Sequence, residues 1–466
     1  MEYISGCAHR VRRSAKRARS GEGPGHNVPI GRLRRPLVAT GLGDHVARPD
    51  TAYRRSSGVP DVTEGEGMEL VTAPRILLAD GLIGPGWVQF EGGRIVACGR
   101  GRQPGAPTVE LPRGVLAPGL IDLQLNGAYG EDFADAELSG WQDVSSRLPE
   151  TGVTAFVPTI ITAPIVELCA TMTRYRSIRA EIDGGGGART LGLHCEGPFL
   201  ATGRHGAHPQ DLLVDPTPER VDTLLAAADG AMTYLTLAPE RPGALPAIRE
   251  LIAAGVRVAV GHSDATDAEV LAATDAGASL VTHLFNAQRP LRHRDPGVVG
   301  AGLAEPRLTL GLIVDLHHVA PTVVRATFAA AAGRIALVTD AIAALGMPAG
   351  TYDLGGQRVE VREQVPPVRE DGTLAGSVLR LDDAVANTIA CGVDAATALT
   401  AATRVPADAI GRNDLGRLTP GSPADLVWLD DDWRAAATWV GGRPAYLDRA
   451  RLPDGSVPAQ EWETGS

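Results

Sequence analysis

Short apolar runs alternate with helix-patterned stretches over most of the chain. Eight runs have the length and β-rich composition of buried strands; they span residues 115–125, 155–159, 190–195, 233–237, 257–260, 280–282, 308–314 and 335–338. Ala- and Leu-rich stretches with helical spacing lie at 221–228, 244–254, 268–276 and 322–332. Since eight βα units close a parallel barrel, this pattern predicts an α/β fold with a (β/α)8 TIM-like barrel.

The segments that flank this region have a different pattern. Residues 68–117 contain short strands broken by Gly-rich turns, and residues 414–452 return to a strand pattern. We expect these two segments to form one small β-sandwich domain, with the barrel spanning 118–413. After the eighth strand, the pattern predicts a hairpin-like insertion over 351–374, followed by two helices at 382–391 and 394–402.

The first 67 residues are rich in Arg, Gly, Ser and Pro and show no apolar periodicity, which predicts a disordered tail. They carry 12 Lys and Arg against 7 Asp and Glu, although the whole chain has a net charge of −11. We expect that the natural start is Met68 and that the upstream segment is a start-site artefact; the alternative is a basic tail with a role of its own. Residues 453–466 are expected to form a C-terminal tail.

Composition excludes several classes of function. The acidic net charge argues against nucleic acid as a partner, and no run of 18 apolar residues could span a membrane. The five cysteines are widely spaced and form no CxxC, which favours a reducing, cytoplasmic location. Lys16 is the single lysine, so the body of the chain has no Schiff-base or P-loop lysine and must hold any phosphate through Arg, His or backbone N–H groups.

Polar side chains stand at the ends of three predicted strands. Glu196 and His283 follow an apolar run directly and His262 follows one after Gly261, and the C-terminal ends of barrel strands converge on one face. Imidazole and carboxylate groups suit Zn²⁺ and similar ions, and a catalytic site keeps one position open for water. We therefore predict a metal site, the alternative being a barrel mouth lined with solvated polar groups.

Two further residues are candidates for proton transfer and carbonyl polarisation. Asp340 ends the eighth strand, where a carboxylate beside an activated water could act as general acid and base. The alternative for Asp340 is a helix N-cap, which Asp favours. His208 and His205 lie on the loop after Glu196, and either could polarise a carbonyl.

The loop after His283, HLFNAQRPLRHRDPG, is basic. It carries Arg289, Arg292 and Arg294 together with His293. The guanidinium group of arginine can donate two parallel hydrogen bonds to a phosphate or carboxylate, so the loop predicts an anionic ligand. The alternative is a solvated basic loop.

Eight motifs, spread in order over nearly all of residues 68–450, together carry a family resemblance: PGLIDLQLNG (118–127), HCEGPF (194–199), GAHP (206–209), GHSDAT (261–266), THLFNA (282–287), DLHHV (315–319), VTDA (338–341) and LAGS (374–377). In these motifs the chain resembles the N-acetylglucosamine-6-phosphate deacetylases of the amidohydrolase superfamily. The resemblance implies a metal-dependent barrel enzyme with a small β-sandwich, usually a homodimer.

The resemblance also implies roles for individual residues. Glu196, His262 and His283 would hold the metal, and Asp340 would be the catalytic carboxylate, with His208 assisting at the oxyanion. The positions matching substrate contacts in the family are Ala207, His208, Asn286, Ala287, Arg294, His318, Leu374, Ala375 and Gly376. In the family, the arginine that matches Arg294 contacts phosphate and can be lent by the partner subunit.

The chain departs from the superfamily pattern at two places. Gln124 and Asn126 stand where many amidohydrolases carry HxH, so we expect one divalent ion per subunit, Zn²⁺ by preference. Leu316 replaces a small residue of the family's DGxHV pattern, which affects the backbone near His318.

The resemblance implies hydrolysis of the acetamide of N-acetylglucosamine 6-phosphate to glucosamine 6-phosphate and acetate, in amino-sugar catabolism and cell-wall recycling. Two alternatives remain: another metal-dependent deacylase or cyclic-amide hydrolase of the same superfamily, and a non-catalytic barrel scaffold. The sequence leaves open the glucosamine or galactosamine epimer and the identity of the metal.

Overall fold

The computed structural model describes residues 67–103, 105–362 and 365–451. The expectations made for residues 1–66 and 453–466 lie outside the described part of the chain. Among the described residues, no helix is long and apolar enough to cross a membrane.

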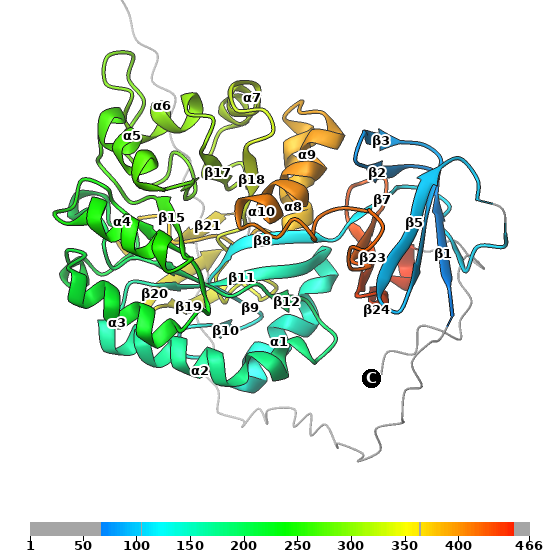
Figure 1. The fold of residues 1–466 in the computed structure, drawn as a ribbon, viewed down its shortest axis with the longest axis horizontal. Helices are drawn as coiled ribbons and strands as arrows, with labels where there is room; N and C mark the ends of the chain where they lie inside the picture. Colours follow the sequence, from blue (N-terminus) through cyan, green and yellow to red (C-terminus); the bar gives the residue numbers. More distant parts are fainter. Residues whose placement is uncertain (1–66, 104, 363–364, 452–466) are drawn as a thin grey trace, which may run out of the picture. The chain divides into compact units, whose positions relative to one another are not determined.

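The barrel is built from eight parallel strands, as predicted (Figure 1). They are β8 (Leu120–Leu125), β11 (Val153–Ile161), β13 (Leu193–Glu196), β14 (Met232–Leu237), β15 (Arg257–Val260), β16 (Leu280–Val281), β17 (Thr309–Leu312) and β18 (Ile335–Leu337). Each pairs in parallel with the next, and the short strand β12 (Arg189–Thr190) extends the pairing of β11. The ring closes where Leu125 bridges Ala341 and the Asp340 N–H donates to the Gln124 carbonyl over 2.9 Å.

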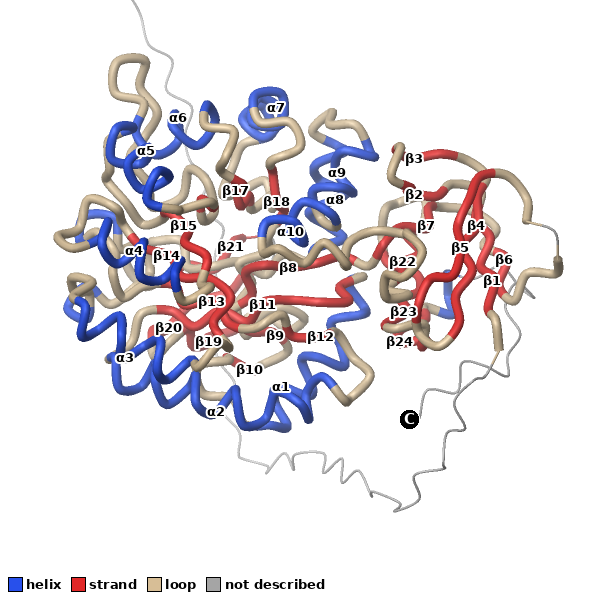
Figure 2. The backbone as a smooth tube through the Cα atoms, in the orientation of Figure 1, coloured by secondary structure: helices blue, strands red, loops and turns tan. Residues whose placement is uncertain are grey.

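Helices surround the barrel strands, which lie inside them in Figure 2. They are α1 (Leu138–Arg147), α2 (Ile165–Asp183), α3 (Pro218–Ala228), α4 (Ala244–Ala253), α5 (Asp267–Ala276), α6 (Gly297–Ala304), α7 (Pro321–Ala330), α8 (Leu381–Ala390), α9 (Ala395–Ala401) and α10 (Arg404–Ala409). The start of α5 is fixed by a capping box, in which Thr266 and Glu269 satisfy each other's backbone N–H groups. The predicted helices are confirmed as α3, α4, α5, α7, α8 and α9.

The small domain consists of two sheets. One has the order β5-β4-β1-β6 and the other the order β24-β23-β22-β7-β2-β3. Their strands are β1 (Glu69–Ala73), β2 (Ile76–Leu78), β3 (Gly81–Ile83), β4 (Gly86–Glu91), β5 (Arg94–Arg100), β6 (Val109–Glu110), β7 (Val115–Pro118), β22 (Leu426–Leu429), β23 (Ala435–Val440) and β24 (Arg443–Leu447). Phe90 from the first sheet and Trp428 and Trp439 from the second belong to one buried cluster, as a sandwich requires.

The apolar run predicted as one strand over 115–125 is divided. Its first part is β7, which pairs antiparallel with β22 in the sandwich, whereas β8 of the barrel begins at Leu120. The break lies at Gly119, where a Cβ atom would come within 2.1 Å of Thr154 Oγ1. Only glycine therefore lets the chain pass this closely into the barrel, and an apolar pattern alone does not reveal the break.

The insertion after the eighth strand is a three-stranded antiparallel sheet, β19 (Gly350–Leu354), β20 (Gln357–Arg362) and β21 (Val365–Val368). Leu354 and Val359 pack in one buried cluster with Ile161 at the end of β11 and Ala207 in the loop after β13. The insertion thus covers part of the C-terminal face of the barrel, near the two-stranded ribbon β9 (Gly127–Ala128) and β10 (Glu131–Asp132).

Candidate active site

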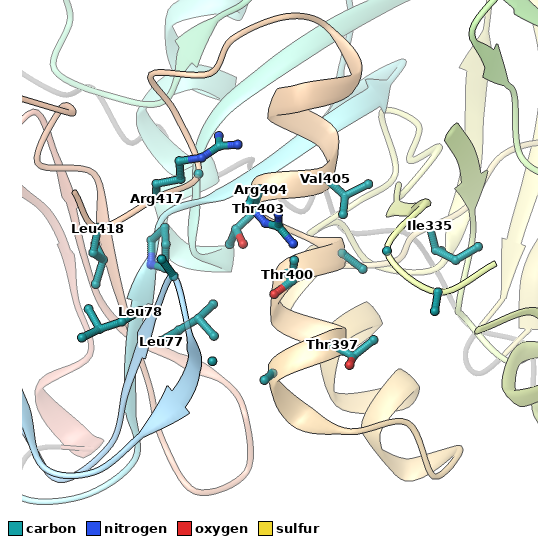
Figure 3. A pocket seen from close by; sticks show the side chains of 18 of the residues that line it. Leu77, Leu78, Ile335, Thr397, Thr400, Thr403, Arg404, Val405, Arg417 and Leu418 are labelled. Atoms are coloured by element: carbon teal, nitrogen blue, oxygen red, sulfur yellow. The ribbon is translucent and has the colours of Figure 1, made fainter. Parts of the chain in front are cut away.

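Two cavities are candidates for the site. One, of about 460 Å³, lies between β2 of the sandwich and α9 and α10 of the barrel (Figure 3). Apolar, threonine and arginine residues line it, and none of its lining residues is a His, Asp, Glu or Cys. The other, of about 380 Å³, lies at the C-terminal ends of the barrel strands and is lined by Glu196, four histidines and Asp340. The groups capable of acid–base or metal chemistry are therefore in the second cavity.

Glu196, His262 and His283 meet at this second cavity. Glu196 is the last residue of β13, and the histidines follow β15 and β16 by two residues each. Glu196 Oε1 lies 2.9 Å from His283 Nε2 and 3.2 Å from His262 Nε2, and the two Nε2 atoms are 3.1 Å apart. All three residues are buried. The strand ends thus bring together the three residues predicted as ligands.

The donor atoms fit a divalent ion. Tetrahedral ligands with bonds of about 2.0–2.1 Å are separated by roughly 3.3 Å, close to the three distances above. His262 Nδ1 lies 2.9 Å from the Arg204 carbonyl, and an N–H donated to that oxygen leaves the Nε2 lone pair free for a metal. Burial raises the pKa of Glu196, but its contacts with the imidazoles of His262 and His283 hold the pKa well below its usual range. The carboxylate is therefore ionised, as a ligand must be.

Three of the proposed metal-ligand and proton-transfer residues have left-handed backbone conformations. The φ angles are 47° at His262, 26° at His283 and 49° at Asp340. Non-glycine residues rarely adopt such angles, which cost about 1–3 kcal/mol each and gather at functional sites. Each of these residues lies two or three positions after the end of a barrel strand.

Asp340 lies beside the proposed ligands. Its Oδ1 accepts hydrogen bonds from Gln124 Nε2 (3.0 Å) and Asn126 Nδ2 (2.8 Å), and Gln124 Nε2 also reaches both oxygens of Glu196 (3.3 and 3.2 Å). Burial and, next, the charge of Glu196 raise the pKa of Asp340 to about 6. The N-cap alternative is wrong, because the next helix of the described chain is α8, which begins at Leu381.

His208 is buried next to the proposed metal site. Its Nε2 is 3.9 Å from Glu196 Oε2, and its Nδ1 is 2.8 Å from Thr162 Oγ1. The Thr162 backbone N–H donates to the same Nδ1 over 3.3 Å, which places the proton of the neutral ring on Nε2. Burial and the neighbouring His262 hold the pKa of His208 well below its usual range, so the ring is neutral. Such a ring can donate one hydrogen bond from Nε2 to a ligand.

Most of the predicted substrate contacts line the same cavity. They are Ala207, His208, Asn286, Ala287, His318, Leu374 and Gly376. Ala375 is fully buried and does not line the cavity, and Arg294 is exposed on its loop and does not line it either. Arg289 of that loop pairs with Asp295 over 2.9 Å, so part of its charge is neutralised within the chain.

His318 is held in place by its own loop. Its Nδ1 lies 2.7 Å from Asp315 Oδ2, and Asp315 Oδ1 accepts the backbone N–H groups of His317 and His318. Burial raises the pKa of Asp315, but the His318 hydrogen bond and charge outweigh it and lower the pKa overall. Leu316 has a φ of 66°, the conformation that a glycine adopts at lower cost.

Sequence reasoning missed several residues of the cavity. Arg204 and Thr373 line it, as do the apolar residues Ile161, Ile313 and Leu354. Arg204 pairs with Asp264 through Nε and Nη2, at 2.9 and 2.6 Å. Its position in the sequence, between Glu196 and His208, was the signal that could have identified Arg204. Asn126 was considered only as a missing metal ligand, although it also lines the cavity.

Known proteins resemble this chain in both sequence and structure. A sequence profile of the amidohydrolase family matches residues 115–446. The N-acetylglucosamine-6-phosphate deacetylase of Vibrio furnissii is 38% identical over 340 residues, which cover 72% of this chain and 84% of that protein. The N-acetylgalactosamine-6-phosphate deacetylase of Escherichia coli O157:H7 is 38% identical over 333 residues, covering 71% of this chain and 88% of that protein.

Among solved structures, one similar to this chain is a mutant N-acetyl-D-glucosamine-6-phosphate deacetylase from Mycobacterium smegmatis in complex with N-acetyl-D-glucosamine-6-phosphate. It has a TM-score of 0.78 and 35% sequence identity, and the match covers 82% of this chain and 100% of that one. This match extends over more of the chain than the family profile does.

Proposed function

Because the chain belongs to the amidohydrolase family, we propose that it hydrolyses the acetamide of N-acetylglucosamine 6-phosphate to glucosamine 6-phosphate and acetate. The observation that carries this proposal is the meeting of Asp340 with Glu196, His262 and His283 at the barrel's C-terminal face. A second candidate is the galactosamine epimer, since a relative named for that activity is equally similar. We place the enzyme in amino-sugar catabolism and cell-wall recycling, in the cytoplasm.

The ligand set supports one divalent ion per subunit, for which we favour Zn²⁺. When bound, this ion supplies Lewis-acid polarisation and lowers the pKa of water. A second ion beside the carboxylates of Glu196 and Asp340 has poor ligands here, because Gln124 and Asn126 turn their amide NH2 groups, and not their oxygens, toward these carboxylates. Amide N–H groups are donors and do not coordinate a cation.

Asp340 transfers protons in both halves of the reaction. As a carboxylate it accepts a proton from the water that attacks the acetamide carbonyl. His208 donates from Nε2 to the oxygen on which negative charge develops. When the C–N bond breaks, the electron pair goes to nitrogen, and Asp340 returns its proton there. Acetate and the free amine result.

Binding of the substrate's phosphate group requires a cation that the subunit's own cavity does not supply. Arg294 is exposed and makes no ion pair within the described chain, whereas Arg289 and Arg204 are paired with Asp295 and Asp264. We propose a homodimer in which Arg294 enters the site of the partner subunit and binds the phosphate. His318 and the loop of Asn286 and Ala287 would contact the sugar phosphate from within the subunit.

A substrate panel tests this function. Acetate release is measured with N-acetylglucosamine 6-phosphate, its galactosamine epimer and unphosphorylated N-acetylglucosamine, using zinc-loaded protein. We expect the glucosamine phosphate to give the highest kcat/KM and the unphosphorylated sugar the lowest. If activity were highest on the galactosamine phosphate, this epimer would be the substrate in place of the glucosamine phosphate. Acetate release from none of the three would reject the proposal.

A further inference from the structure

The Asn126 side chain at the cavity wall has only one of its two polar atoms hydrogen-bonded. It follows β8 directly, is 2% exposed and lines the catalytic cavity. Its Nδ2 donates to Asp340 Oδ1 over 2.8 Å. Its Oδ1 is buried and has no hydrogen-bond partner among the described residues. Buried amide oxygens are nearly always paired, so this atom requires a donor that the described chain does not provide.

The orientation of this amide is fixed by Asp340. If the amide were reversed, Asn126 Oδ1 would lie about 2.8 Å from a carboxylate oxygen, and two acceptors would face each other. The unpaired atom is therefore the carbonyl oxygen, which can only accept. Gln124 differs from Asn126, because its amide donates to Asp340 and Glu196 and it does not line the cavity.

We propose that Asn126 Oδ1 accepts the N–H of the scissile acetamide, an inference that rests on the proposed deacetylase function. A single side chain then holds the two reacting groups together, Asp340 through Nδ2 and the substrate nitrogen through Oδ1. The N–H stays on Asn126 while the attacking water gives its proton to Asp340. As the C–N bond breaks, the electron pair develops on a nitrogen held beside Asp340, which returns the proton. The residue thereby selects N-acyl over O-acyl substrates.

Asn126 has two possible roles, accepting the substrate N–H through Oδ1 and positioning Asp340 through Nδ2. A substrate that lacks the N–H distinguishes them, because only the second role remains. The assay compares kcat/KM on N-acetylglucosamine 6-phosphate with kcat/KM on 2-O-acetylglucose 6-phosphate, the ester analogue. Asn126→Leu removes both hydrogen bonds, and we expect it to lose about three- to tenfold more on the amide than on the ester. Asn126→Ala also removes both hydrogen bonds, without placing a bulky apolar group beside Asp340, and should show the same larger loss on the amide.

Gln124→Met is the matched control. It removes a donor to Asp340 of the same kind without removing a group from the cavity wall, so its losses should be equal on both substrates. Zinc content and Tm are measured for each variant. Equal losses on amide and ester in Asn126→Leu would overturn the proposal, as would equal losses in Asn126→Ala, which decides the matter if the leucine variant does not fold. Wild-type protein without activity on the amide would instead reject the deacetylase function itself.

Discussion

The cavity at the C-terminal strand ends and the cavity between sandwich and barrel have similar volumes, about 380 and 460 Å³, but different walls. The first brings the buried Glu196 carboxylate within 4 Å of the His262 and His283 imidazoles, and both histidines have a positive φ. The second has threonine hydroxyls and two arginines on apolar walls (Figure 3). Size therefore does not identify the site, whereas buried groups with shifted pKa values do.

Among single substitutions that leave the metal ligands intact, we expect those at Asp340 in the first cavity to lower activity the most. Asp340→Asn keeps the shape but cannot accept a proton, and we expect kcat to fall about 10³–10⁴-fold, the upper part of the range for a positioned proton-transfer group. Zinc content should be unchanged and the substrate should still bind, which isothermal titration checks. A variant that retains more than about a tenth of wild-type kcat would assign the proton transfer to another group, with His208 the first to test.

Arg294 tests whether the site is completed by a second subunit. A charge-assisted hydrogen bond to phosphate is worth about 1.5–3 kcal/mol, so Arg294→Ala should lower kcat/KM on the phosphorylated sugar about ten- to a hundredfold. The rate on unphosphorylated N-acetylglucosamine should hardly change. Arg292→Ala, on the same loop, is the control and should have a smaller effect. Equal losses on both substrates would make Arg294 structural.

Substitution of Leu316 tests whether its positive φ lowers the stability of the protein. Leu316→Gly removes the cost of a positive φ from a side chain that is 38% exposed, and should raise the free energy of unfolding by about 0.5–1 kcal/mol. Denaturant unfolding measures this change. Leu291→Gly, at an exposed loop leucine without a positive φ, should lower it slightly. A destabilised Leu316→Gly variant would show that the leucine side chain, through its packing, outweighs the strain.

Arg404 gives the smallest expected effect, because it lies at the cavity without acid–base groups. It makes no ion pair within the described residues. Arg404→Ala should keep kcat/KM within about twofold of the wild type, since single surface changes rarely alter distant sites. A loss comparable to that of Arg294→Ala would mean that the second cavity takes part in catalysis.

The barrel and the grouping of its polar strand ends could be predicted because buried parallel strands form apolar runs that end in recognisable residues. Glu196, His262, His283 and Asp340 were found in this way, although their roles remain predictions. The division at Gly119 could not be predicted, because it depends on contact with Thr154, far along the chain. Nor could the amide contacts of Gln124 and Asn126, which depend on side-chain directions across the barrel.

Stepwise metal loading tests the central claim, that one ion held by Glu196, His262 and His283 supports catalysis beside Asp340. Metal-stripped protein is titrated with Zn²⁺, and acetate release is measured at each addition. We expect activity to rise linearly and level off at about one equivalent per subunit, and His283→Asn to show no such rise. A plateau at two equivalents would contradict the single-ion site, and full activity in the stripped protein would contradict the metal site altogether.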